Sequence, residues 1–477
     1  MIDCDDCGVS GSVPTYEQLA ALVVEQAGQI ERLTARVAEL ERRLGLNSRN
    51  SSKPPSSDGL AKPVSRSLRG ESGRRAGGQP GSAGTTLRQV ADPDEVVVHR
   101  PERCRGCRGR LDAAAVTSTA VRQVFDVPPL RVRVTEHRVV TCRCGGCGQT
   151  TAGMVPAGVA APVQYGPGVA AIVVYLAVRQ HIPVARLAEL CAEVLGIDVS
   201  TGWVAAQLRP AARALTGFTD RVAAAVRAAS VAHFDESGAR VDGRIQWLHS
   251  ASTPTLTHYH LDVKRGRVAM DAAAILPAFT GVAVHDCWAS YFGYVELDHA
   301  VCNAHILREL TGWHETDPVR QAWAKDMIEL LGEANRAVIR ARADGRTGLD
   351  PTTLARFDTR WTELINTAYE INPRPKAGRG VRIVALIDRL RTATTEIWRF
   401  TRNFAVPFDN NQAERDIRMV KLQNKISGGW RTQHGARDWL TIRAYISTVA
   451  KNRINIHQAL RDALTGNAWL PPLPDGT

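Results

Sequence analysis

Apolar positions divide the chain into stretches with different periods. Residues 15–46 place apolar side chains at alternating steps of four and three, the spacing of a helix with a heptad seam. Residues 47–90 are polar and rich in Ser, Pro and Gly, so they cannot bury a core. From residue 229 onward, short apolar runs separated by turn residues predict strands. The pattern predicts a multidomain protein, mainly α-helical, with an α/β core.

The heptads of residues 15–46 favour self-association. β-branched residues dominate one seam position and leucines the other, which favours a parallel two-stranded coiled coil. Arg36 could reach Glu41 of a partner helix. A helix packed on its own chain is the alternative, but four heptads with one polar break favour a homodimer or higher oligomer. The seam consists of Leu19, Val23, Gln26, Ile30, Leu33, Val37, Leu40 and Leu44.

Positive charge is concentrated after the heptads. The 477-residue chain has a formal net charge of +12, and residues 47–90 hold eight Arg and Lys against two acids. A basic linker can lie along the phosphates of double-stranded DNA without reading sequence, although such segments are often only solubilising. There is no 18-residue apolar run and no signal pattern at the N-terminus. We therefore expect a cytoplasmic, nucleoid-associated protein without membrane contact.

Of the three Cys-x2-Cys pairs among the ten cysteines, Cys4 with Cys7 has no obvious second pair, and the other two indicate a metal. In a reduced compartment, paired cysteines point to metal ligands rather than disulfides. Cys104 with Cys107, and Cys144 with Cys147, supply four thiolates for a closed, tetrahedral Zn²⁺ site. Cys142 is a rival for one ligand position, and unpaired core cysteines are the alternative. A closed site has no open position, so we assign it structural and DNA-placing roles.

The segments around these pairs predict a zinc ribbon followed by helices. Two β-like runs, 121–127 and 131–141, lie between the cysteine pairs. The following segment predicts a helix at 183–195, a short turn and a helix at 201–208. A helix-turn-helix is one interpretation. The second helix offers few base-reading side chains, so plain helical packing is at least as plausible.

Two apolar runs end on aspartates, Asp235 and Asp286. Ligands gather at the carboxyl ends of buried strands. Between the two runs, the pattern predicts an Asp242-Gly243 hairpin, a third strand at 256–261 and a helix near 269–278. This order matches a ribonuclease-H-like mixed sheet, in which the first and fourth strands are adjacent. We therefore expect Asp235 and Asp286 to lie side by side.

A third acid, Glu414, opens a basic helix downstream. Arg418, Lys421 and Lys425 recur at helical spacing on its face, so the acid is expected to hold metal and the basic residues DNA phosphates. A structural alternative is a capping box between Asn411 and Glu414. A helical insertion at about 311–405 accounts for the 128 residues between Asp286 and Glu414.

Taken in order, these motifs resemble a transposase of the insertion sequence 66 family. They include the heptads, the linker with Lys-Pro-Pro-Ser-Ser-Asp58, the paired cysteines and the two aspartates. Cys302-x2-His305, Asn-Asn-x-Ala-Glu414-Arg and the Lys-Ile-Ser-Gly-Gly-Trp-Arg-Thr432 run complete the series.

The resemblance implies a DDE-type triad at Asp235, Asp286 and Glu414, with Mg²⁺ as the working metal. Two such ions activate a water or a 3′-hydroxyl for in-line displacement at phosphorus. The resemblance also suggests companion transposition proteins as partners. Glu236 could be mistaken for a ligand. Cys302 and His305 match a signature of uncertain role, and we do not expect either to hold the metal.

The predicted function is DNA cleavage and strand transfer at the ends of a mobile element. The alternatives are a transposase-derived DNA-binding regulator without catalysis and a metal-dependent DNA nuclease. The expected domains are an N-terminal coiled-coil segment (1–46), a basic linker (47–99), a zinc ribbon (100–150), a helical, helix-turn-helix-like domain (165–226), a catalytic domain (229–465) and a tail (466–477).

Overall fold

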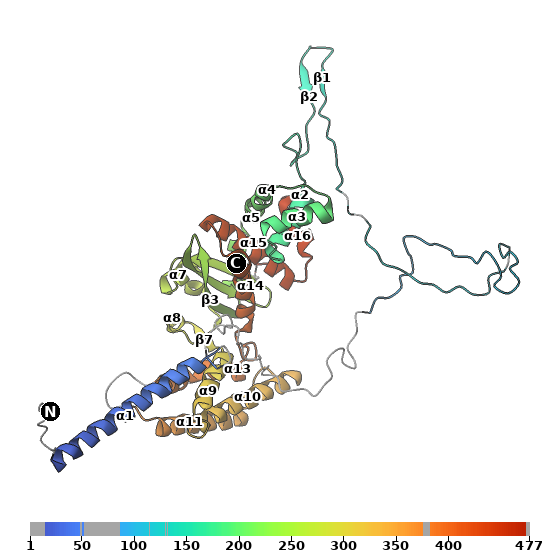
Figure 1. The fold of residues 1–477 in the computed structure, drawn as a ribbon. Helices are drawn as coiled ribbons and strands as arrows, with labels where there is room; N and C mark the ends of the chain where they lie inside the picture. Colours follow the sequence, from blue (N-terminus) through green and yellow to red (C-terminus); the bar gives the residue numbers. More distant parts are fainter. Residues whose placement is uncertain are drawn as a thin grey trace, which may run out of the picture. The chain divides into compact units, whose positions relative to one another are not determined.

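The protein is described from a computed structural model (Figure 1), which covers residues 15–47, 50–51, 86–113, 115–128, 130, 132–374 and 382–473. Cys4, Cys7, most of the basic linker and residues 375–381 of the predicted insertion lie outside these residues. Contacts divide the chain into two units. One comprises Met1–Pro63, His137–Glu189 and Val199–Thr477, and the other comprises Val64–Glu136 and Leu190–Asp198.

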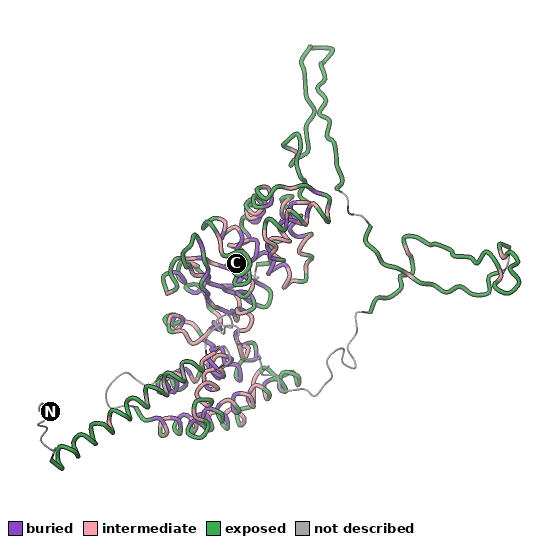
Figure 2. Tube along the Cα trace, in the orientation of Figure 1, coloured by how far each residue is buried: buried purple, intermediate pink, exposed green. Residues whose placement is uncertain are grey.

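Helix α1 spans Tyr16–Gly45, as the heptads predict. Its seam is open to solvent within one chain, because Ile30 is 64% exposed and Leu33 is 59% exposed. Figure 2 shows α1 exposed along its length, in contrast to the buried residues of the helical insertion and the sheet. No helix among the described residues has the length and apolar character needed to cross a membrane.

Around the cysteine pairs, the structure has less regular sheet than predicted. Strands β1 (Thr141–Arg143) and β2 (Thr150–Ala152) form an antiparallel hairpin. The strand predictions for 121–127 and for the described residues of 131–140 are wrong. These segments are largely exposed, and the antiparallel ladder begins only at Thr141, after both of them.

The helical region before the sheet follows the prediction with one break. Ser200 caps α4 by accepting a hydrogen bond from the Trp203 N–H. The predicted 201–208 helix ends at Ala206, because Pro210 lacks an N–H and its ring would clash with the Ala206 carbonyl. The elements are α2 (Pro167–Val174), the π-helix η2 (Tyr175–Arg179), α3 (Val184–Leu195), α4 (Thr201–Ala206), α5 (Leu208–Arg213) and α6 (Phe218–Arg227).

A five-stranded mixed sheet forms the centre of the larger unit, in the order β5-β4-β3-β6-β7. The first three strands pair antiparallel, and β3-β6 and β6-β7 pair parallel. Asp242 and Gly243 both have positive φ, as the predicted hairpin turn requires. The strands are β3 (Val231–Val241), β4 (Arg244–Ser252), β5 (Thr257–Asp262), β6 (Val282–His285) and β7 (Asp298–Val301).

Strand β6 joins two hydrophobic cores. Successive side chains of a strand point to opposite faces. Ala283 packs into a core with α5, α6, α15 and α16, whereas Val282 and Val284 pack into a core built mainly from the helical insertion. The insertion is therefore fixed directly to the strand that precedes Asp286.

The remaining helices extend from these cores. Short helices connect the strands, α9 to α13 form the insertion, and three helices close the chain. They are α7 (Arg267–Ala272), the 3₁₀ turn η3 (Leu276–Ala278), α8 (Ala289–Phe292), α9 (Asn303–Thr316), α10 (Ala322–Ala343), α11 (Pro351–Ile371), α12 (Arg382–Thr392), α13 (Thr394–Arg402), α14 (Asn411–Ser427), α15 (Gln433–Lys451) and α16 (Ile456–Leu464).

Candidate active site

The structure brings Asp235 and Asp286 to neighbouring strands. Strand β3 pairs in parallel with β6 over Val231–His233, so the expected adjacency is confirmed. Asp286 directly follows β6. Asp235, however, is not at a strand end: β3 continues to Val241, and Asp235 lies opposite Ser250 of β4. The prediction placed a strand end there because the apolar run stops at this aspartate, whereas pairing with β4 keeps the backbone extended.

Acidic groups crowd Asp235. Burial raises its pKa well above the ordinary value, and the carboxylates of Glu236, Asp286 and Glu414 raise the pKa further. Lys421 acts in the opposite direction and favours the charged form. All three predicted acids therefore share one electrostatic environment. Such a cluster of carboxylates gains stability from a nearby cation.

Glu236 has other partners. Its carboxylate forms an ion pair with the Arg265 guanidinium at 2.6 Å and accepts a hydrogen bond from the Tyr291 hydroxyl at 2.7 Å. The Arg265 guanidinium also lies over the rings of Trp247 and Trp288, at 4.9 and 4.2 Å from their centroids. These contacts fix Glu236 within a cation–π cluster, consistent with its exclusion as a metal ligand.

Asn410 positions the start of α14 against the sheet. Its side chain hydrogen-bonds His233 at 2.8 Å and donates to the Phe234 carbonyl, also at 2.8 Å. Its backbone N–H donates to the Cys302 sulfur at 3.1 Å. These contacts join the residue before Asp235 to the start of the helix that carries Glu414, 176 residues further along the chain.

The capping-box alternative for Glu414 is wrong. Asn410, not Asn411, occupies the N-cap position, and the Asp409 carboxylate accepts from the Asn411 N–H. The Glu414 carboxylate instead lies 3.8 Å from Nε2 of His305 and 4.0 Å from Arg308. Its side chain is therefore directed at α9 rather than at its own helix terminus.

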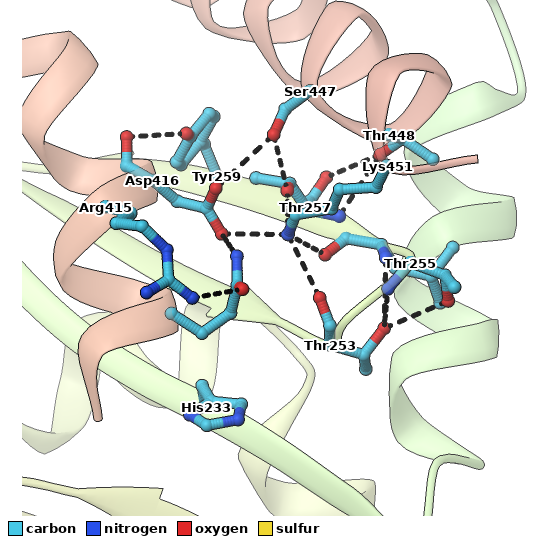
Figure 3. A network of polar contacts seen from close by, with 12 residues as sticks. His233, Thr253, Thr255, Thr257, Tyr259, Arg415, Asp416, Ser447, Thr448 and Lys451 are labelled. Carbon is cyan, nitrogen blue, oxygen red and sulfur yellow. Dashed lines mark hydrogen bonds and ion pairs between the residues drawn. The ribbon is translucent and has the colours of Figure 1, made fainter. Parts of the chain in front are cut away.

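A buried polar network anchors the first turns of α14 (Figure 3). The Lys451 ammonium of α15 forms an ion pair with Asp416 at 2.9 Å and donates to Thr257 at 2.6 Å. Tyr259 of β5 donates its hydroxyl to the Asp416 carbonyl at 2.9 Å. Because Asp416 is two residues after Glu414, this network limits the movement of the carboxylate relative to the sheet.

Cys302 and His305 lie closer to the candidate site than the sequence indicates. Cys302 occupies the N-cap position of α9, and His305 is in its first turn. Ligand atoms of Cys302, His305 and Glu414 all lie within 4.8 Å of one another. The sequence signal was the Cys-x2-His spacing after a short strand, but a single pair could not indicate that Glu414 joins it.

The basic residues expected on α14 face solvent. Arg418, Lys421 and Lys425 are all exposed, while Ile417 and Val420 on the opposite side are buried. The Gly428-Gly429-Trp430 turn then returns the chain to β3: Trp430 exchanges backbone hydrogen bonds with Arg240 and Asp242. The stripe is thus presented by a helix fixed at both ends.

The two cysteine pairs form the same local turn. In each, the first cysteine N–H donates to the carbonyl five residues on, and its carbonyl accepts from the N–H four residues on. Backbone N–H groups of Cys107 and Gly106 lower the pKa of Cys104, and those of Cys147 and Gly146 lower the pKa of Cys144. N–H groups directed at sulfur are suited to holding a thiolate.

Comparison with known families decides the classification. The family model described as "Transposase IS66 family" matches residues 162–438, which are 277 of the 477 residues. The chain belongs to this transposase family. A second model, for a family of unknown function (DUF6444), matches residues 13–88, and no curated protein matches the chain.

The match confirms the resemblance inferred from the ordered motifs. It covers the part of the transposase that carries Asp235, Asp286 and Glu414, together with the insertion between them. The cysteine pairs at 104–107 and 144–147 precede it. A transposase function thus follows from the family.

Proposed function

We propose that this transposase cleaves DNA at element ends and transfers the strands with Asp235, Asp286 and Glu414 as a DDE triad. The supporting observation is the parallel pairing of β3 with β6, which places two aspartates together, with Glu414 close enough to raise the pKa of Asp235. The strand order β5-β4-β3-β6-β7 supports a ribonuclease-H-like core with a helical insertion.

The acids suit Mg²⁺. Carboxylate oxygens are its preferred ligands, and the mutual repulsion around Asp235 is relieved by a divalent cation. We assign two Mg²⁺ ions to Asp235, Asp286 and Glu414. When bound, such ions activate the attacking oxygen and stabilise the leaving oxygen of an in-line displacement.

The chain's own residues orient the site. Asn410 and the Asp416–Lys451 pair hold Glu414 against the sheet. The Trp288 N–H donates to the Asp286 carboxylate at 3.0 Å and fixes its orientation. Arg418, Lys421 and Lys425 then offer positive charge to DNA phosphates beside the acids.

Three further assignments complete the proposal. Cys104, Cys107, Cys144 and Cys147 bind structural Zn²⁺, a role supported by the N–H groups directed at Cys104 and Cys144, with Cys142 as the rival ligand. The open seam of α1 pairs two or more copies. Companion transposition proteins are further partners implied by the family resemblance.

Single substitutions of the acids test the triad. Asp235→Asn, Asp286→Asn and Glu414→Gln are each expected to lower cleavage of end-containing DNA by about three orders of magnitude, because each removes a ligand charge that the transition state needs. Binding to the ends should persist. The measurement is cleavage of labelled DNA in Mg²⁺, beside a mobility-shift assay.

Asp242→Asn is the matched control, since Asp242 lies in the exposed β3–β4 turn, where Asn also adopts positive φ. Full cleavage by all three acid variants would reject the triad. If the wild-type protein binds element ends but does not nick them, the alternative of a DNA-binding regulator without catalysis is supported instead. If the wild-type protein nicks DNA but cannot join pre-cut ends to a target, the alternative of a metal-dependent nuclease is supported.

A further inference from the structure

Cys302, His305 and Glu414 form a mixed cluster beside the proposed magnesium site. Its ligand atoms lie within 4.8 Å of one another. A thiolate, an imidazole and a carboxylate are the ligand types of Zn²⁺ and similar cations. Mg²⁺ takes oxygen ligands instead, so the sulfur and nitrogen atoms have no place in the proposed magnesium chemistry.

Two atoms of this cluster are buried without a hydrogen-bond partner among the described residues. They are Nδ1 of His305 and Oε1 of Glu414. Arg308 approaches the other carboxylate oxygen, Oε2, at 4.0 Å, which leaves Oε1 facing Nε2 of His305 at 3.8 Å. An unsatisfied buried carboxylate oxygen destabilises the fold. A cation between these groups would remove that cost.

The surroundings of Cys302 suit a bound thiolate. The residue is fully buried at the N-terminus of α9, and its sulfur accepts from the Asn410 N–H at the start of α14. Both helix termini therefore present positive ends to the sulfur. When a cation binds the sulfur, the thiol proton passes to solvent.

We propose that Cys302, His305 and Glu414 bind one thiophilic divalent cation of the Zn²⁺ class. Three protein ligands leave a fourth position, which water can fill. The site differs from the Asp235–Asp286 pair in its ligand chemistry and shares only Glu414 with the proposed triad. It does not depend on the proposed function, since a chain that never cleaves DNA would still bind the cation.

Binding of Co²⁺ alone to the purified full-length protein tests this site. Co²⁺ replaces Zn²⁺ and absorbs visibly when thiolate-bound. Other cysteines also take Co²⁺, so the decisive quantity is the difference between variants. Wild type is expected to bind one Co²⁺ more than Cys302→Ser or His305→Ala. Cys287→Ser is the matched control, because Cys287 is a nearby, partly buried cysteine outside the cluster, and it should bind as wild type does.

Equal Co²⁺ stoichiometry and equal absorption in wild type and both variants would overturn the proposal. Thermal unfolding identifies a variant that fails to fold. If Cys302→Ser fails, His305→Ala still decides, because His305 is partly exposed. Metal content is measured without DNA. Full cleavage by the three acid variants in Mg²⁺ with an intact Co²⁺ difference therefore rejects the triad alone. Lost cleavage in those variants with equal Co²⁺ binding by wild type, Cys302→Ser and His305→Ala rejects this site alone.

Discussion

Asp235 and Glu236 are consecutive acids with different surroundings. Glu236 is held by Arg265 and by the Tyr291 hydroxyl, whereas Asp235 accepts from the Glu236 N–H and lies near Lys421. Partners supplied by distant segments thus separate two chemically similar side chains into different roles. The sequence shows both acids, but it does not show which side chains surround each of them in the fold.

His258 provides a residue-scale prediction on pH. Burial lowers its pKa from 6.5 to about 4, so the folded state resists protonation that the unfolded chain accepts. The contribution of neutral His258 to the free energy of unfolding is complete above pH 6.5 and declines as the pH falls toward 4. Lowering the pH from 7 to 5 should therefore reduce the free energy of unfolding by about 2 kcal/mol through this residue.

In His258→Leu, the loss of stability between pH 7 and pH 5 should be smaller than in wild type by that amount. Urea unfolding at the two pH values measures it. Exposed His434 is the control position, and His434→Leu should leave the pH dependence unchanged. An identical pH dependence in His258→Leu would contradict the expectation.

At the scale of elements, α14 depends on its two ends. Asn410 fixes the beginning to β3, and the glycine turn returns the chain to the end of the same strand. Gly428 ends the helix with φ +71°, and Gly429 has φ +107°. The Lys-Ile-Ser-Gly-Gly-Trp motif therefore has a structural reason, independent of catalysis.

Gly429→Ala should destabilise the protein by about 2–3 kcal/mol, since its Cβ would lie 2.5 Å from the Arg240 carbonyl oxygen at a strained φ. Gly428→Ala is the comparison, because nothing lies within 4 Å of its added Cβ. Only the backbone penalty applies there, about 1 kcal/mol. Chemical unfolding should rank the two variants. Equal costs would show that the contact with Arg240 is not tight.

The basic stripe gives a second prediction at this scale. If Arg418 and Lys425 contact phosphates, Arg418→Ala/Lys425→Ala should weaken DNA binding and reduce the slope of log K against log salt by roughly 2. Titrations of end DNA at several salt concentrations measure the slope. Arg415→Ala is the control, since Arg415 pairs with Gln412 instead. An unchanged slope in the double variant would place DNA elsewhere.

At the scale of the whole molecule, a single chain does not explain why helix α1 carries an apolar seam. Its apolar seam is exposed, although burying such residues is favourable. The heptad pattern predicts that a second copy of the chain packs against this seam.

Ile30→Asp/Leu33→Asp should convert an oligomer to a monomer, because buried charges at the seam oppose pairing. Light scattering after size exclusion measures the mass. Arg32→Asp lies outside the seam and is the control. Oligomers that persist in the double variant would rule out α1 as the interface.

The sequence by itself determined the elements whose signals are local. Heptad spacing predicted α1, the Asp242-Gly243 pair predicted the hairpin, and ordered motifs indicated the family. These succeed because periodicity and turn chemistry act over a few residues. The strand predictions for 121–127 and for the described residues 132–140 failed because a strand also depends on pairing with another segment, which local sequence does not specify.

Only the tertiary structure decided how distant residues meet. It extended β3 through Asp235, because pairing with β4 continues past the apolar run. It directed Glu414 toward Cys302 and His305 rather than into a capping box, because Asn410 ties the start of α14 to β3 and to Cys302. Such contacts join segments more than a hundred residues apart, and no local pattern in the chain encodes them.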